Sequence, residues 1–183
     1  MKTNLNTQKM VINALLLALG AILHQITPAL GFPMQPDMAL AMLFILIILN
    51  KDNYKSCLSA SIVTGIFAAI TTKFPGGQLP NIIDKIIIMH LAYITINRLL
   101  KLNVFKRLNT SNQNSILLYI ILPIGTLISG TIFLGSAMVL TGLPAPFTAL
   151  FLTVVIPTTL LNTIAGTFLF KVVILALKRS AFV

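Results

Sequence analysis

The chain has very little acidic charge and few reactive side chains. Its 183 residues include three acidic residues, one cysteine and two histidines. A single cysteine excludes an intrachain disulfide and a thiolate metal set. The histidines, His24 and His90, are distant in sequence, and no Ser/His/Asp grouping or metal cluster appears. We therefore expect neither an enzyme nor a protein that carries a metal or cofactor.

Several kinds of transport machinery are also missing from the sequence. No ATPase motif is present, so active transport would need a separate motor subunit. No acidic ring or filter motif marks an ion channel. No inverted repeat of the secondary-transporter kind is evident.

Apolar residues dominate what is present. The chain is 57% hydrophobic and 9% charged, with a mean hydropathy of +0.97. A membrane-spanning helix needs about 20 apolar residues, and about six such segments use nearly the whole length, which leaves no room for a soluble catalytic domain. We predict one all-α membrane domain, a six-helix bundle with helices over 7–27, 38–49, 55–73, 82–100, 115–140 and 147–178. The polar stretch 104–114 is predicted to be a loop, and the first apolar run an uncleaved helix rather than a signal peptide.

The basic residues predict the orientation of this bundle. Most fall at alternate ends of the apolar segments, namely Lys2, Lys9, Lys51, Lys55, Arg98, Lys101, Lys106, Arg107, Lys171, Lys178 and Arg179. Loops rich in Lys and Arg stay in the cytoplasm. We therefore predict a protein of the bacterial plasma membrane with both termini on the cytoplasmic side. The net charge of +10 then reflects topology and anionic lipid rather than nucleic acid.

Small residues form a stripe on the first helix. Ala14, Ala18 and Ala21 share one face, and such stripes let another helix approach closely in lipid. Two interpretations fit: packing within the bundle, or docking of a partner subunit. The segment 28–37 contains three prolines, so it is no regular helix and is predicted to fold onto the outer side of the bundle as a lid or plug.

Two of the three acids lie on the predicted outer side. Asp52 lies between two lysines and is expected to be solvated. Asp37 and Asp84 each stand near a helix start, where a carboxylate can cap the helix. Asp84 is followed by Lys85, and an ionisable pair near membrane depth is also a candidate for function.

The loop before Asp84 predicts a binding site. Gly76 and Gly77 let backbone N–H groups approach a ligand, and the following helix start adds unpaired N–H groups that suit a carboxylate. Asp84 would take an ammonium, so the combination fits a zwitterionic amino acid. The alternative is a turn that merely joins two helices.

Two motifs carry a resemblance to a known family. They are Met34-x-Pro36-Asp37 followed by Ala41-Met42-Leu43-Phe44, and Thr71-Thr72-x-Phe74-Pro75-Gly76-Gly77-Gln78-x-Pro80-Asn81-x-x-Asp84-Lys85. With Ala14-xxx-Ala18, they resemble S components of energy-coupling-factor (ECF) transporters, and more narrowly the tryptophan-specific family. The resemblance implies a six-helix membrane subunit that captures L-tryptophan outside the cell. It also implies partners: a transmembrane T subunit, docked on Ala14 and Ala18, and two cytoplasmic ATPase subunits.

From this resemblance we expect a site built from loop and helix residues. Asp84, beside Lys85, is assigned to the ammonium, and the amides of Gly76 and Gly77 with Gln78 and Asn81 to the carboxylate. Asn162 is expected to accept the indole N–H. The apolar walls are expected to be Met34, Phe74, Met138 and Phe147.

The absence of tryptophan from the chain fits this resemblance, and two alternative functions remain. The chain has no tryptophan, which favours a protein made during tryptophan starvation, although chance explains it too. A stand-alone ion-coupled transporter of an aromatic solute is the first alternative, with Asp84 and His24 as its only candidate ion site. A structural or regulatory subunit without a ligand is the second.

Overall fold

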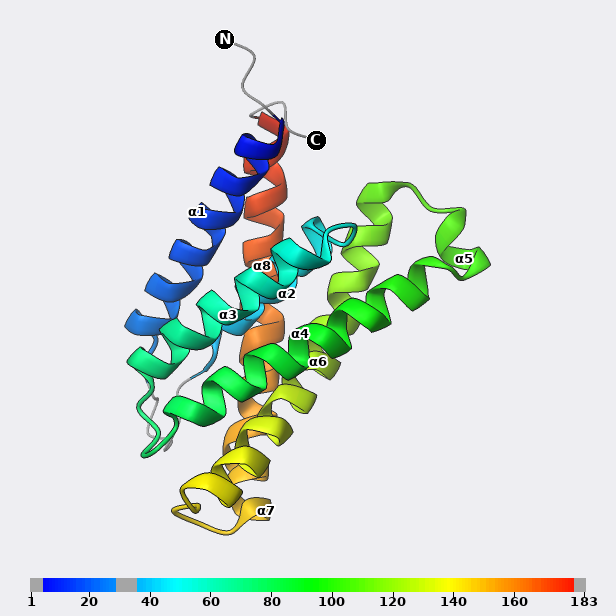
Figure 1. Cartoon of the computed structure of the whole chain (residues 1–183). Coiled ribbons are helices and arrows are strands. Elements are labelled where there is room, and N and C mark those ends of the chain that lie inside the picture. The colour runs from blue at the N-terminus through cyan, green and yellow to red at the C-terminus, as the bar shows by residue number, and fades with distance from the viewer. Residues whose placement is uncertain (1–4, 29–35, 180–183) are drawn as a thin grey trace.

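The computed structural model describes residues 5–28 and 36–179, and within these ranges it is helical, with no strand. Five helical segments are long and apolar enough to cross a membrane, and a shorter apolar helix accompanies them. The helices are arranged as a tilted bundle (Figure 1). Their bounds are α1 (Leu5–Ile26), α2 (Met38–Leu49), α3 (Tyr54–Thr71), α4 (Gln78–Leu100), α5 (Asn103–Lys106), α6 (Thr110–Leu140), α7 (Phe147–Leu150), the π-helical turn η1 (Phe151–Val155) and α8 (Ile156–Arg179).

The short helix α2 is the core of the bundle. Every residue from Met38 to Ile48 is buried, because the helix is apolar on all sides and the other long helices surround it. Its polar groups lie at its ends: the Asp37 carboxylate accepts from the Leu40 N–H at 2.9 Å, and Asn50 caps the other end. Twelve residues span about 18 Å, so α2 is too short to cross a bilayer of about 30 Å.

Capping residues set where the helices begin. Helix α4 begins at Gln78, earlier than the predicted residue 82, because Gly77 is its N-cap and a proline is tolerated in a first turn. The prediction of a loop over 104–114 is wrong. Helix α5 lies there, and α6 begins at Thr110 because the Asn109 side chain accepts from the Asn112 N–H at 2.8 Å.

The last helical segment is continuous from Phe147 to Arg179. It contains the π-helical turn, which ends two residues before Pro157, whose nitrogen carries no hydrogen to donate. Gly130 on α6 makes room for this turn, since a Cβ at Gly130 would lie 2.5 Å from Val155 Cγ1.

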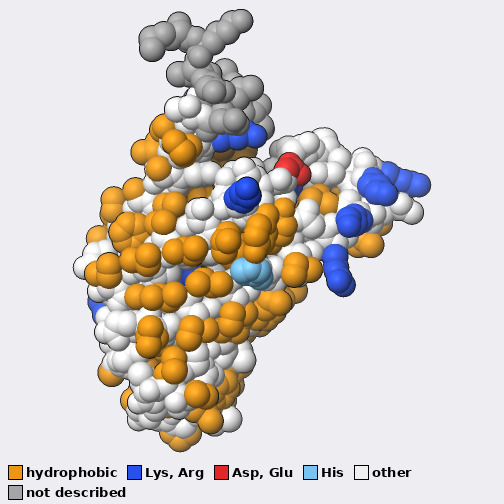
Figure 2. Space-filling view, viewed as in Figure 1, with side chains coloured by type: hydrophobic (Ala, Val, Ile, Leu, Met, Phe, Trp, Pro, Cys, Tyr) orange, Lys and Arg blue, Asp and Glu red, His pale blue; other side chains and the backbone are white. Residues whose placement is uncertain are grey.

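The surface separates into apolar and basic parts. Hydrophobic side chains cover the middle of the face shown in Figure 2, and Lys and Arg gather around α5 and toward the end where α1 begins. Helix α1 is largely exposed: Leu16, Gly20 and His24 are buried against the bundle, while Ala14 and Ala18 are exposed. Most of α1 is therefore open to lipid or to another protein.

Close packing around α2 gives a stability prediction. A Cβ at Gly125 would lie 2.6 Å from Cζ of Phe44, a fully buried ring, so Gly125→Ala forces the core apart. We expect a loss of about 1–3 kcal/mol, typical of overpacking, measured as reversible unfolding in detergent. Gly135→Ala is the matched control, because a Cβ there meets nothing within 4 Å. If Gly125→Ala and Gly135→Ala are equally stable, the close packing of Gly125 against Phe44 is contradicted.

Candidate functional site

An ionic cluster is buried between α2, α4 and α6. Lys85 Nζ lies 2.5 Å from Asp84 Oδ2 and 2.6 Å from Asp37 Oδ2. The Ser129 hydroxyl donates to the same Asp84 oxygen at 2.8 Å. Lys85 and Asp84 are each 1% exposed. Such charges are tolerated inside a membrane protein only when they are paired, and the Lys85 ammonium here bridges two carboxylates.

His24 brings α1 to the same cluster. Its Nδ1 lies 3.4 Å from Asp37 Oδ1, and the ring is buried. Burial acts to raise the pKa of Asp37, but the charges of Lys85 and His24 and two hydrogen bonds outweigh it and leave this pKa below its ordinary value. Asp37 is therefore a carboxylate that caps α2 and also binds Lys85.

The local sequence explains how these groups meet. Asp84 and Lys85 stand nearly two turns inside α4, beyond the reach of its start, so Asp84 does not cap this helix. Gly65 on α3 lets α4 approach closely, because a Cβ at Gly65 would lie 3.2 Å from Ile82 Cα. The close approach of α3 and α4 buries this part of α4.

A small cavity lies against the cluster. Its volume is about 50 Å³, and its lining comprises His24, Asp37, Thr72, Lys73, Phe74, Asn81, Asp84, Lys85, Ser129 and Phe133. Phe74 and Phe133 meet edge to face there, with ring centroids 5.3 Å apart. This volume suits a few water molecules, whereas sites for small organic ligands measure about 300–1,000 Å³. An organic ligand must therefore widen the cavity on binding.

The structure brings together some of the predicted site residues. Phe74, Asn81, Asp84 and Lys85 line the cavity. The Gly77 N–H donates to the Phe74 carbonyl at 3.0 Å, so in this conformation it closes a turn. Gly76 has a φ of +71°, and a Cβ there would lie 2.6 Å from Thr141 Cγ2, so this loop rests on the end of α6.

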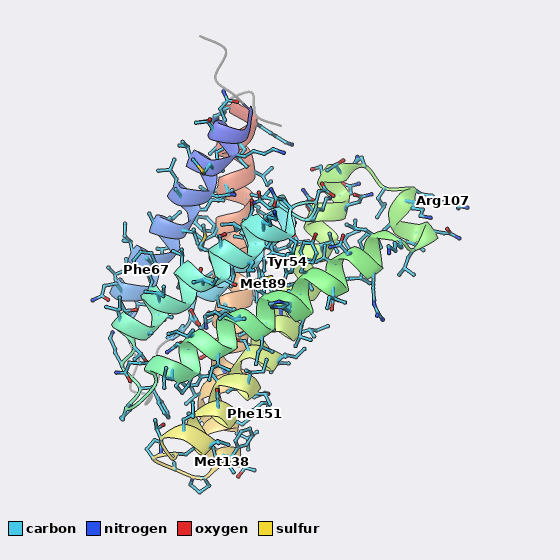
Figure 3. All side chains as sticks on the ribbon, viewed as in Figure 1. Tyr54, Phe67, Met89, Arg107, Met138 and Phe151 are labelled. Carbon is cyan, nitrogen blue, oxygen red and sulfur yellow. The ribbon has the colours of Figure 1, made fainter. Side chains whose placement is uncertain are left out.

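Other predicted residues lie away from the cavity. Gln78 is exposed and Met138 is 58% exposed, while Phe147 stacks on Phe151. Figure 3 shows Met138 and Phe151 beside α7, at the far end of α6. Asn162 on α8 is fully buried but does not line this cavity. Met34 lies outside the described residues.

Six cavity residues are not among the predicted ligand contacts, and three of them show what the sequence does not reveal. The position of Asp37 predicts a helix cap, and in the structure Asp37 caps α2 and also binds Lys85. Ser129 lies one turn after Gly125 on α6, but only the fold shows that this face meets Asp84. Phe133 carries no signal in the sequence, because apolar residues occur on every side of this helix.

The second histidine is satisfied elsewhere. His90 Nδ1 lies 2.7 Å from the Ile86 carbonyl, which can only accept, so Nδ1 carries the hydrogen. Its Nε2 then accepts from the Tyr54 hydroxyl at 2.6 Å. His90 thus links α3 to α4 apart from the ionic cluster.

Apolar helices around a charge-lined internal cavity are typical of membrane transport proteins. Comparison with known families makes the class specific: the family "Tryptophan transporter TrpP" matches residues 6–178, and the chain belongs to this family. No solved structure matches the chain.

Its relatives cover nearly the full length of the chain. A probable tryptophan transport protein of Clostridium perfringens is 53% identical over 176 residues, 96% of each chain. Probable tryptophan transport proteins of Clostridium acetobutylicum and Bacillus subtilis are 50% and 40% identical, over 96% and 97% of this chain and 95% and 97% of their own.

The bridge made by Lys85 gives the prediction from this site. Lys85→Met leaves the carboxylates of Asp37 and Asp84 buried without their counter-ion, so we expect a loss of about 3–5 kcal/mol in unfolding free energy. Thermal unfolding in detergent measures it.

The triple variant Asp37→Asn/Asp84→Asn/Lys85→Met is the matched control. It removes all three charges, and it should recover much of the stability lost by Lys85→Met. If Lys85→Met alone is as stable as the wild type, the ionic bridge does not hold the helices together.

Proposed function

We propose that the chain is the substrate-binding S component of an ECF transporter, which captures L-tryptophan outside the cell and delivers it inward with a T subunit and two ATPases. The observation that carries the binding half of this proposal is the ionic cluster with its adjoining cavity. The family supports tryptophan as the solute. The transporting half rests on the exposed small-residue face of α1 and on the resemblance to S components.

The charges of the cluster suit a zwitterion. Two carboxylates, Asp37 and Asp84, face one lysine, and Oδ1 of Asp84 has no hydrogen-bond partner among the described residues. An ammonium group bound there would balance the second carboxylate. The ligand carboxylate would face Lys73, which lines the same cavity and is exposed to solvent. Phe74 and Phe133 would provide apolar and aromatic contacts for the ring.

The face of α1 favours a partner in the membrane. Ala14 and Ala18 are exposed one turn apart, so a second helix can approach the backbone there. The Lys and Arg residues near the start of α1 and around α5 support the orientation with both termini in the cytoplasm. In that orientation the cavity lies toward the outer surface.

Ligand binding is the first test. Because the chain contains no tryptophan, the ligand supplies the only indole fluorescence in a titration of the purified, detergent-solubilised protein. We expect saturable binding of L-tryptophan at about one site per chain, with a blue-shifted emission. Phenylalanine and niacin, as competitors, should not displace it. Absence of binding by folded protein would refute the assignment of tryptophan.

The docking face gives a separate prediction. Ala14→Leu/Ala18→Leu should abolish tryptophan uptake by cells, and co-purification with the T subunit, while leaving the affinity for tryptophan unchanged. Gly135→Leu is the control, because it adds a bulky side chain on α6 where a Cβ meets nothing. If the Ala14→Leu/Ala18→Leu variant loses tryptophan binding but still assembles with the T subunit, this division of roles is contradicted.

A stand-alone ion-coupled transporter remains the second candidate. The placement of His24 and Asp84 around one cavity favours it, because both groups can exchange protons. This function predicts uptake in cells without T and ATPase subunits, abolished by an uncoupler. The ECF function predicts no uptake in those cells and restored uptake when the subunits are supplied.

A further inference from the structure

Some buried polar groups of the bundle lack hydrogen-bond partners. Among the described residues these include Oδ1 of Asp84, the hydroxyl of Thr126 and both amide atoms of Asn162. Asn162 is 0% exposed, on a helix that is otherwise largely apolar. A buried amide with neither of its hydrogen-bonding ends satisfied is unfavourable, so this group is suited to a partner that arrives with a ligand.

The contacts between α6 and α8 place Thr126 opposite Asn162. A Cβ at Gly166 on α8 would lie 2.8 Å from Leu122 on α6, and one at Gly130 on α6 would lie 2.5 Å from Val155. The two helices are therefore antiparallel. Thr126 lies one turn after Leu122, and Asn162 lies one turn before Gly166, so both stand at the same level.

The ionic cluster lies at the same level along the bundle as Thr126 and Asn162. Ala41 also lies against Gly166, and Asp37 stands one turn before Ala41. On α6, Thr126 shares one buried face with Ser129, which bonds Asp84, and with Phe133, which lines the cavity. This face leads from the charged groups to the neutral pair of Thr126 and Asn162.

The chemistry of the two ends matches the two ends of one ligand. The charged cluster suits the ammonium and carboxylate of an amino acid, whereas a neutral carboxamide suits a neutral donor. The indole N–H donates and cannot accept. Resting on the proposed function, we infer that Asn162 and Thr126 form the subsite that recognises the indole N–H, with Asn162 Oδ1 as acceptor and the Thr126 hydroxyl as a partner of the amide.

A role in ligand recognition accounts for two buried polar groups without hydrogen-bond partners among the described residues. The cavity ends before Asn162, so the ring must open a path along α6 to reach it. A ligand without the N–H would open the same path and still leave the amide unsatisfied. Discrimination against such a ligand is the function that the pair would serve.

The test compares L-tryptophan with 3-benzothienylalanine, in which sulfur replaces the ring N–H and the shape is nearly kept. The wild type should prefer L-tryptophan by about tenfold or more, the ratio that corresponds to one hydrogen bond. Asn162→Leu should abolish the preference by weakening the binding of tryptophan alone, and Thr126→Val should reduce it. Thr163→Val is the matched control, because its hydroxyl bonds the Thr159 carbonyl within its own helix at 2.7 Å, and it should keep the preference.

Stability without ligand separates this role from a structural one. Asn162→Leu should unfold at the same temperature as the wild type or higher, because it removes an unsatisfied group. A lower unfolding temperature, a retained preference, or an equal loss of affinity for both ligands overturns the inference. If the Asn162→Leu variant does not fold, the Asn162 side chain has a structural role and the inference fails. If the wild type binds neither ligand, the proposed function fails as well.

Discussion

The Lys85 ammonium is the group on which the arrangement of this bundle depends. It bonds carboxylates from two helices, and one of these also accepts from a hydroxyl on a third. In water such pairs contribute little, but inside a bilayer each unpaired charge is highly unfavourable. The positions of α2, α4 and α6 relative to one another are therefore constrained by one side chain, which is 1% exposed.

This constraint also accounts for the small cavity. With Lys85 bridging Asp37 and Asp84, the surrounding helices close on a space of about 50 Å³. The cluster leaves one carboxylate oxygen of Asp84 without a hydrogen-bond partner among the described residues, although the other oxygen bonds both Lys85 and Ser129.

Much of the fold follows from sequence patterns, and the exceptions have identifiable causes. Apolar length predicts the helices well, since few other structures satisfy the backbone in lipid. The polarity of the segment 104–114 predicts a loop, but α5 lies there and the Asn109 side chain caps the start of α6. The sequence predicts Met138 and Phe147 beside the ligand, but both lie away from the cavity, Met138 at the far end of α6. Where apolar residues occur on every side of a helix, composition does not reveal which face is inside.

The sequence by itself determined that the chain is an apolar helical protein, that its acids are few and that Asp84 and Lys85 stand together. These are properties of composition and of neighbouring residues. Only the tertiary structure decided that Asp37, His24 and Ser129 join them, and that Asn162 is fully buried. Those contacts join residues far apart in the chain, and they depend on the rotation and register of packed helices, which local sequence does not specify.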